Sequence, residues 1–109
     1  MSKPTDLVQG TLDLLILKVV ALEPMHGWAM AHRIRQISSN VLQVGESALY
    51  PALHKLEQQG WIEAEWKMSE NNRRAKYYRL TRAGSKAMAK EADHWERLSA
   101  AISLIVRGA

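Results

Sequence analysis

Two neighbouring stretches of this sequence carry side chains suited to binding a polyanion. In the first, Leu49, Leu53 and Leu56 recur at steps of four and three residues, which predicts a helix with one buried stripe. The side chains left on its outer face are Ser47, Tyr50, His54, Lys55 and Gln58. Exposed polar groups at the N-terminal end of such a helix can reach base edges and phosphates in a major groove. An ordinary solvated helix face accounts for the helix alone equally well.

The second stretch is a basic segment that follows this helix. Residues 71–82 contain no acidic residue and five cations, Arg73, Arg74, Lys76, Arg79 and Arg82. The first two flank a predicted turn, where such side chains contact phosphates or enter a minor groove and give salt-dependent affinity. A hairpin tip that only aids solubility and blunts an edge strand is the alternative. A polar helix and a basic hairpin in this order together favour DNA binding.

Other elements must hold these two stretches in place. Residues 10–22 are apolar on nearly every side, which indicates a helix buried on more than one face and ended by Pro24. Period-two alternation from Ile62 predicts the first strand of the hairpin. The expected order is helix, helix, helix, hairpin, helix. The expected bounds are 10–22, 26–37, Ser47 or Ala48 to about Gly60, a hairpin from Ile62 with a return strand over 75–80, and a last helix to about Val106.

Local signals refine these elements. Pro51 should fall in the first turn of the third helix, and Thr81 should cap the last one. On the second helix, Met30, Ile34 and Ile37 recur at helical spacing and should face inward. The tryptophans expected in the core or at its rim are Trp28, Trp61 and Trp66.

The last helix carries an apolar seam at alternating steps of three and four residues. Its members are Met88, Ala92, Trp95, Leu98 (or Ser99), Ile102 and Ile105. A helix of about 24 residues is about 36 Å long, more than a three-helix core of this size can cover. We therefore expect it to pair two copies of the chain, joined by the first helix through Leu15. Trp95 either belongs to the interface core or lines a pocket between subunits for a flat aromatic or apolar compound.

Composition bounds the remaining possibilities. The chain has 109 residues, 47% of them hydrophobic, a net charge of +4 and a pI of about 9.6. The absence of cysteine excludes disulfides and thiolate metal sites. No signal peptide or membrane-spanning run is visible, so we expect a cytoplasmic protein.

Catalysis finds no support in the sequence. Its histidines, at positions 26, 32, 54 and 94, are scattered, and no metalloprotease, P-loop or nucleophile-elbow motif occurs. Asp93 and His94 are adjacent and so point to different helix faces, which makes an exposed polar pair the better account than a metal site. We expect no cofactor, no metal and no enzymatic activity.

Several motifs together resemble the PadR family of bacterial transcriptional regulators. They are the runs at residues 10–17 (GTLDLLIL), 25–28 (MHGW), 47–53 (SALYPAL), 56–62 (LEQQGWI) and 73–81 (RRAKYYRLT), followed by Ala83-Gly84. The resemblance covers residues 7 to about 85. Two departures concern the site: Glu46 and Ala48 stand where the family often has small or hydroxyl residues, and Trp28 stands where tyrosine is more usual.

The resemblance implies a homodimeric regulator, usually a repressor, of the compact branch with a single helix after the wing. It implies that Ser47, Tyr50, His54 and Lys55 face DNA from the recognition helix. From the wing, the implied contacts are Asn72, Arg73, Arg74 and Lys76. Some compact members hold apolar or aromatic compounds near the dimer centre.

We therefore expect a mainly α protein with a small β-hairpin (α+β). Residues 7–81 should form a winged helix-turn-helix, residues 82–107 a C-terminal dimerisation helix, and residues 1–6 should be disordered. The expected function is repression from a pseudo-palindromic operator bound by a homodimer. The alternatives are a winged-helix module that binds proteins and a dimer that senses small molecules, neither with specific DNA binding.

Overall fold

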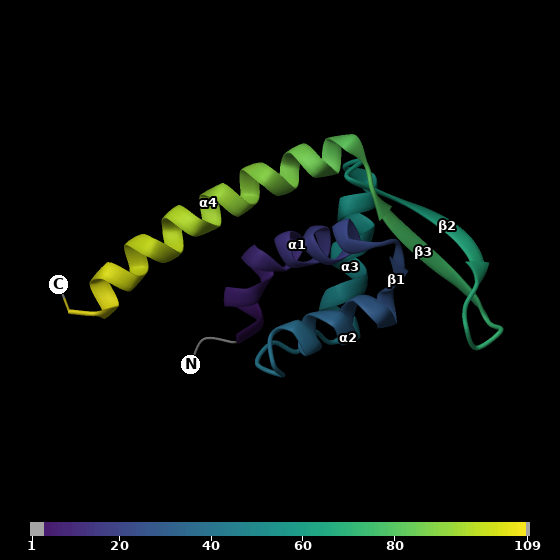
Figure 1. Cartoon of the computed structure of the whole chain (residues 1–109), viewed down its shortest axis with the longest axis horizontal. Coiled ribbons are helices and arrows are strands. Elements are labelled where there is room, and N and C mark those ends of the chain that lie inside the picture. The colour runs from purple at the N-terminus through teal and green to yellow at the C-terminus, as the bar shows by residue number, and fades with distance from the viewer. Residues whose placement is uncertain (1–3, 109) are drawn as a thin grey trace.

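Four helices and a small antiparallel sheet make up the part of the chain that the structure describes. The computed structural model describes the backbone of residues 4–108 and the side chains of residues 11–108 (Figure 1). In chain order the elements are α1 (Pro4–Leu22), β1 (Met25–His26), α2 (Gly27–Ile37), α3 (Glu46–Gln58), β2 (Ile62–Met68), β3 (Arg74–Leu80) and α4 (Arg82–Val106). The α+β class is as predicted. The first helix begins at Pro4, so residues 4–6 of the segment expected to be disordered lie within it, whereas residues 1–3 lie outside the described chain.

The core forms where α1, α2 and α3 meet. Helix α1 contacts α2, α3, α4 and β3, which explains why its sequence is apolar on nearly every side. The predicted stripe of α3 is confirmed, since Leu49, Leu53 and Leu56 are each at most 2% exposed. On α2, Met30 and Ile34 are buried as predicted, but Ile37 is exposed because it is the last residue of its helix.

The sheet has the order β1–β3–β2, with both pairs antiparallel. Strands β2 and β3 form the predicted hairpin, in which Ile62 pairs with Leu80 and Met68 with Arg74. Strand β1 was not predicted. Two residues are too short to show a period, and β1 is a strand only because Met25 and His26 pair with β3 some fifty positions later in the chain.

Two tryptophans expected in or near the core are exposed, and that expectation is wrong for them. Trp28 is 68% exposed because it follows the buried Gly27 at the start of α2 and so points outward from the helix. Trp66 is 55% exposed because the hairpin continues beyond the helices that cover its base (Figure 1). Trp61, just before β2, is half-buried against the core, as expected.

A tight junction sets where α4 leaves the hairpin. Thr81 caps α4 as predicted, because its Oγ1 accepts a hydrogen bond from the Gly84 N–H at 3.0 Å. The same hydroxyl donates to the Gly60 carbonyl at 2.6 Å. A Cβ at Gly84 would lie 1.9 Å from the Trp61 carbonyl oxygen, so only glycine lets α4 approach this closely. The direction of α4 is therefore fixed at its first turn.

Candidate nucleic-acid interface

The first turns of α3 present polar groups to solvent. Ser47, Tyr50 and His54 lie at i, i+3 and i+7, are exposed, and share one side of the helix opposite its leucine stripe. Pro51 lies beside them in the second turn, not in the first as predicted, because α3 already begins at Glu46. Proline there removes the N–H that would bond to the Ser47 carbonyl. Because its side chains are exposed, this side of α3 can contact another molecule.

Tyr50 is held in place although it is 47% exposed. Its ring lies against Gly27, the first residue of α2: a Cβ added at Gly27 would be 3.0 Å from Tyr50 Cε1 and 3.1 Å from its hydroxyl oxygen. A larger residue at position 27 would therefore push the ring away. The orientation of Tyr50 depends on this close contact between α2 and α3.

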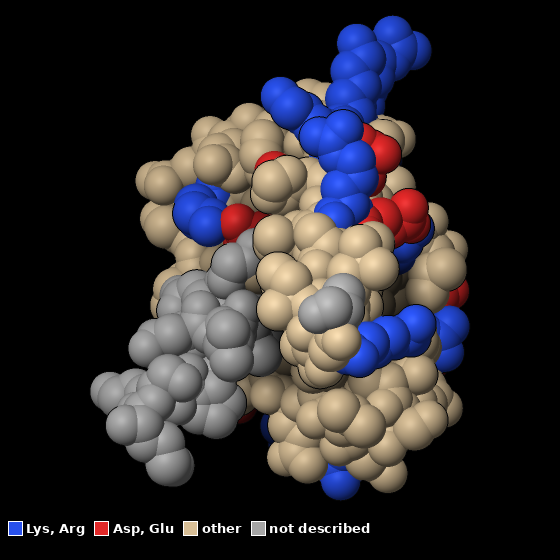
Figure 2. Space-filling model, turned by 90° about the vertical axis from the view of Figure 1, so that its left-hand side faces the viewer, with Lys and Arg blue, Asp and Glu red and all other residues tan. Residues whose placement is uncertain are grey.

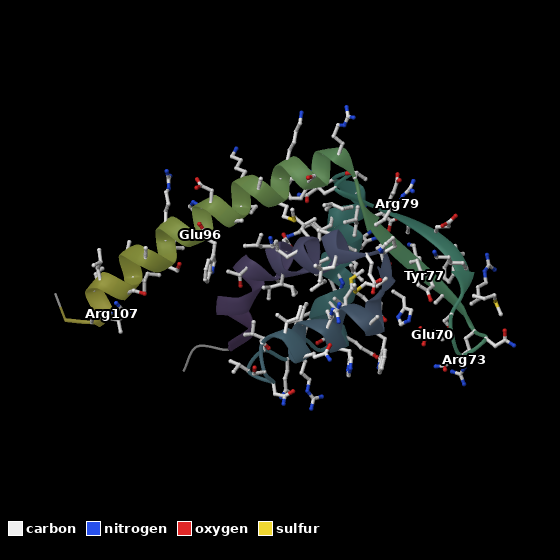
Figure 3. All side chains as sticks on the ribbon, in the orientation of Figure 1. Glu70, Arg73, Tyr77, Arg79, Glu96 and Arg107 are labelled. Atoms are coloured by element: carbon white, nitrogen blue, oxygen red, sulfur yellow. The ribbon has the colours of Figure 1, made fainter. Side chains whose placement is uncertain are left out.

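The hairpin tip presents two arginines and an asparagine. A tight turn closes it, with the Ser69 N–H donating to the Arg73 carbonyl at 2.7 Å and Asn72 in the left-handed region at φ 61°. Arg73 lies at the free end of the hairpin (Figure 3). Arg74 lies over the Trp66 ring, 5.1 Å from its centroid. Within residues 11–108, neither arginine makes an ion pair.

The two lysines expected at the interface are paired with carboxylates. Lys55 Nζ lies 2.5 Å from Asp13 Oδ2 of α1. Lys76 Nζ donates to Glu57 Oε1 of α3 at 3.1 Å. The hydrogen bond to Glu57 raises the pKa of Lys76, against the lowering effect of burial. The sequence-predicted site residues thus fall into two sets. Lys55 and Lys76 are in ion pairs, whereas no ion pair within residues 11–108 involves the others, which are Ser47, Tyr50, His54, Asn72, Arg73 and Arg74.

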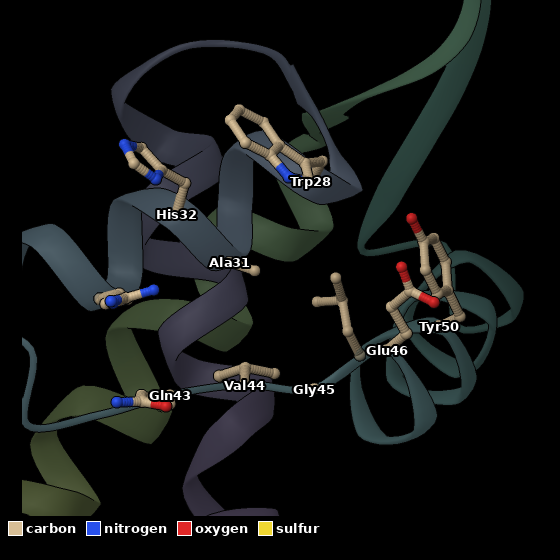
Figure 4. A pocket seen from close by; sticks show the side chains of 10 residues that line it. Trp28, Ala31, His32, Gln43, Val44, Gly45, Glu46 and Tyr50 are labelled. Atoms are coloured by element: carbon tan, nitrogen blue, oxygen red, sulfur yellow. The ribbon is translucent and has the colours of Figure 1, made fainter.

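Sequence reasoning missed a row of residues on α2. Trp28, His32 and Arg35 lie at i, i+4 and i+7 on one side of that helix, and the Trp28 and His32 rings stack with centroids 5.2 Å apart and planes 6° apart. They line a hollow of about 410 Å³ between α2 and α3, with Tyr50 on its far side (Figure 4). Their helical spacing is visible in the sequence, but the expectation that Trp28 lies in the core or at its rim conceals the row.

The seam of α4 is covered in its first half only. Met88 packs against the core and Ala92 is half-buried, as is Leu15 of α1. Further along, the seam is exposed at Trp95, Leu98, Ile102 and Ile105. The opposite side of the helix is basic, with exposed Arg82, Lys86, Lys90 and Arg97. Figure 2 views the molecule from the end toward which α4 runs, and Lys and Arg side chains form a column on the upper part of this view.

Helices α2 and α3, followed by a hairpin with a basic tip and packed on α1, define a winged helix-turn-helix protein. The chain belongs to the PadR-like family of transcriptional regulators, whose model matches residues 16–90. This family consists of DNA-binding regulators rather than enzymes. In the described part of the chain, no helix is long and apolar enough to span a membrane.

Solved structures agree with this assignment. A transcriptional regulator from Clostridium thermocellum is 28% identical, with a TM-score of 0.84 over 93% of this chain and 98% of its own. The protein smu.1704 from Streptococcus mutans is 30% identical, with a TM-score of 0.79 over 99% and 95%. A PadR-like regulator from Bacillus cereus is 22% identical and shares the fold, with a TM-score of 0.80 over 95% and 99%.

A relative is also found by sequence alone. An uncharacterized protein X from Lysinibacillus sphaericus is 27% identical over 104 residues, which is 95% of either chain. The two solved structures at 28% and 30% identity cover 93% and 99% of this chain, so the shared fold extends beyond the winged helix into α4.

Proposed function

We propose that this protein is a homodimeric repressor that binds a pseudo-palindromic operator. The observation that carries the proposal is the exposed polar side of α3 beside two wing arginines that make no ion pair within residues 11–108, in a family of transcriptional regulators. Ser47, Tyr50 and His54 enter the major groove and contact base edges and nearby phosphates.

The wing supplies affinity with little sequence preference. Asn72, Arg73 and Arg74 lie at the hairpin tip, free of carboxylate partners among residues 11–108, so they are available to phosphates or to the minor groove. Binding of each phosphate by a cation releases counterions, which makes the affinity fall with salt concentration.

Helix α2 adds a second line of contacts to the DNA backbone. In helix-turn-helix proteins the first helix of the motif crosses the backbone while the second enters the groove. Trp28, His32 and Arg35 lie on the side of α2 that borders the hollow next to Tyr50. An indole N–H, an imidazole and a guanidinium there are suitable donors to phosphate oxygens.

The second half of α4 joins two copies of the chain. Monomeric soluble proteins rarely expose so many large apolar side chains close together. Those exposed on this half of α4 are Trp95, Leu98, Ile102, Leu104, Ile105 and Val106. An identical helix offers the same stripe, so a two-fold dimer covers both. Such a dimer places two α3 helices at a fixed spacing, which matches an operator with two related half-sites.

Regulation is proposed to act through the same seam. Trp95 lies at its centre and keeps about half of its surface exposed in the single chain. A flat aromatic or apolar effector that stacks on Trp95 between subunits would change the angle between the α4 helices, and with it the spacing of the α3 helices.

Selection of bound duplexes from a random pool tests this function. We expect enrichment of an inverted repeat whose half-sites are roughly one or two helical turns apart. Failure to bind any duplex at low ionic strength would favour a protein-interaction module instead. Quenching of tryptophan fluorescence by aromatic compounds, without duplex binding, would favour a small-molecule sensor.

A further inference from the structure

The ion pair between Glu57 and Lys76 bridges the two parts of the proposed DNA-binding surface. Lys76 belongs to β3 in the wing and Glu57 to α3, with 3.1 Å between Nζ and Oε1. Their side chains are only 35% and 34% exposed. Lys76 Nζ also lies 5.5 Å from the centroid of the Tyr78 ring. The ammonium group is thus held by a carboxylate and an aromatic ring at once.

The position of Glu57 shows where Lys76 points. Glu57 is the last but one residue of α3, ten positions after Ser47, and so lies about 15 Å further along the helix axis. Of the proposed groove-facing groups, Ser47 and Tyr50 are in the first two turns, whereas His54 lies only three residues before Glu57. Lys76 therefore reaches toward the C-terminal end of α3, one turn beyond His54 and far from Ser47.

The strand geometry agrees with this direction. Side chains two residues apart on a strand lie on the same face, so Lys76 shares a face with Tyr78, the first buried residue met on β3 from the tip. The ion pair connects the hairpin to α3 two residues nearer to the tip than that buried anchor. On the partner strand, Trp66 pairs with Lys76 and Met68 lies nearer to the tip, and both side chains are exposed.

We propose that Glu57 is a positioning residue, which through Lys76 sets the distance and angle between the recognition helix and the wing. In this role Lys76 is a support for the wing rather than a phosphate contact. Lys55 is held in a similar way by Asp13 of α1. The inference rests on the DNA-binding function proposed above, and it assigns to an acidic residue a favourable effect on binding to a polyanion.

The effect of removing Glu57's charge separates this role from simple electrostatics. Loss of a negative charge should by itself strengthen binding to DNA. If Glu57 merely kept Lys76 from the phosphates, Glu57→Gln would also free one cation and steepen the salt dependence by about one unit of slope. A positioning role predicts the opposite change in affinity, so that Glu57→Gln weakens operator binding. The slope of the salt dependence stays the same, because the phosphate contacts are unchanged.

The experiment measures binding to the selected operator and to a random duplex over a range of salt concentrations. The variants are Glu57→Gln, Lys76→Gln, the double variant and Lys76→Arg, with Arg73→Gln as the matched control for a phosphate contact. We expect each single Gln variant to weaken operator binding about two- to fivefold, and the double variant to be no weaker than either. Lys76→Arg keeps the ion pair and should stay near wild type, whereas Arg73→Gln should lower the slope by about one.

Two results would overturn the inference. One is tighter binding or a steeper salt dependence in Glu57→Gln, and the other is a slope about one unit lower in Lys76→Gln. Thermal unfolding of each variant checks that the fold is intact. A wild-type chain that bound no duplex would instead refute the proposed function, so the two failures are distinct.

Discussion

Helices α3 and α4 have similar apolar patterns but opposite environments. Both carry large aliphatic residues at steps of three and four. The stripe of α3 is wholly inside the molecule, at Leu49, Leu53 and Leu56, whereas the second half of the α4 seam is in solvent, with Ile105 78% exposed. An apolar stripe therefore indicates that a partner surface exists. It does not say whether that surface is in the same chain.

The cause of the difference is where each helix lies. The leucine side of α3 packs against α1, α2 and β2. Helix α4 contacts α1 near its start and then continues past the other helices (Figure 1). With α4 included, the longest dimension of the molecule is 54 Å. We infer that folding buries the stripe of α3 and that association buries the rest of α4.

The largest expected effect is on assembly. Trp95→Glu places a charge in the middle of the exposed seam, and burying an unpaired carboxylate between two helices is strongly unfavourable. We expect this variant to be a monomer in sedimentation velocity at concentrations where the wild type is a dimer. A dimer that persists in the variant would place the interface elsewhere and break the contrast between the two helices.

A matched pair of truncations compares the two stripes directly. Leu53→Ala removes a fully buried side chain and should lower the free energy of unfolding by about 2–5 kcal/mol at any protein concentration. Ile102→Ala removes an exposed one, so its effect on urea unfolding should depend on protein concentration, because it acts through the dimer.

Leu53→Ala and Ile102→Ala could instead lower the free energy of unfolding equally, at every protein concentration. That result would contradict the division between a stripe buried by folding and one buried by association. It would mean that the second half of α4 is stabilised within its own chain.

The sequence predicted elements whose signals are local. Thr81 as the cap of α4 and the leucine stripe of α3 follow from the residues themselves and are confirmed. The exposure of Trp28 and Trp66 was not predictable from hydrophobicity. For Trp28 it depends on which side of α2 packs on the core, and for Trp66 on how far the helices extend over the hairpin. Strand β1 likewise exists only through its pairing with β3.

The candidate site shows the same limit. Residue type and order pointed to α3 and the wing, but could not tell a free cation from a paired one. Arg73 and Lys76 look equivalent in the sequence, three positions apart in a basic run. In the structure, Arg73 is at the tip and Lys76 is bonded to Glu57, a residue 19 positions earlier in the chain.

The smallest expected effect tests the free cations of the wing. Arg73→Ala combined with Arg74→Ala should leave the fold and the dimer intact, because both side chains are exposed and unpaired within residues 11–108. Binding to operator and to random duplex should weaken alike, since phosphate contacts carry no sequence information. The slope of log affinity against log salt should fall by about one to two units.

A filter-binding or anisotropy titration at several salt concentrations measures this slope. If affinity and slope are unchanged, the wing does not touch phosphates, and α3 alone would carry the proposed contacts. If only operator binding falls, the arginines read sequence in the minor groove. The wing and α3 would then both contribute specificity, and the ion pair between Glu57 and Lys76 would set how both elements meet the bases.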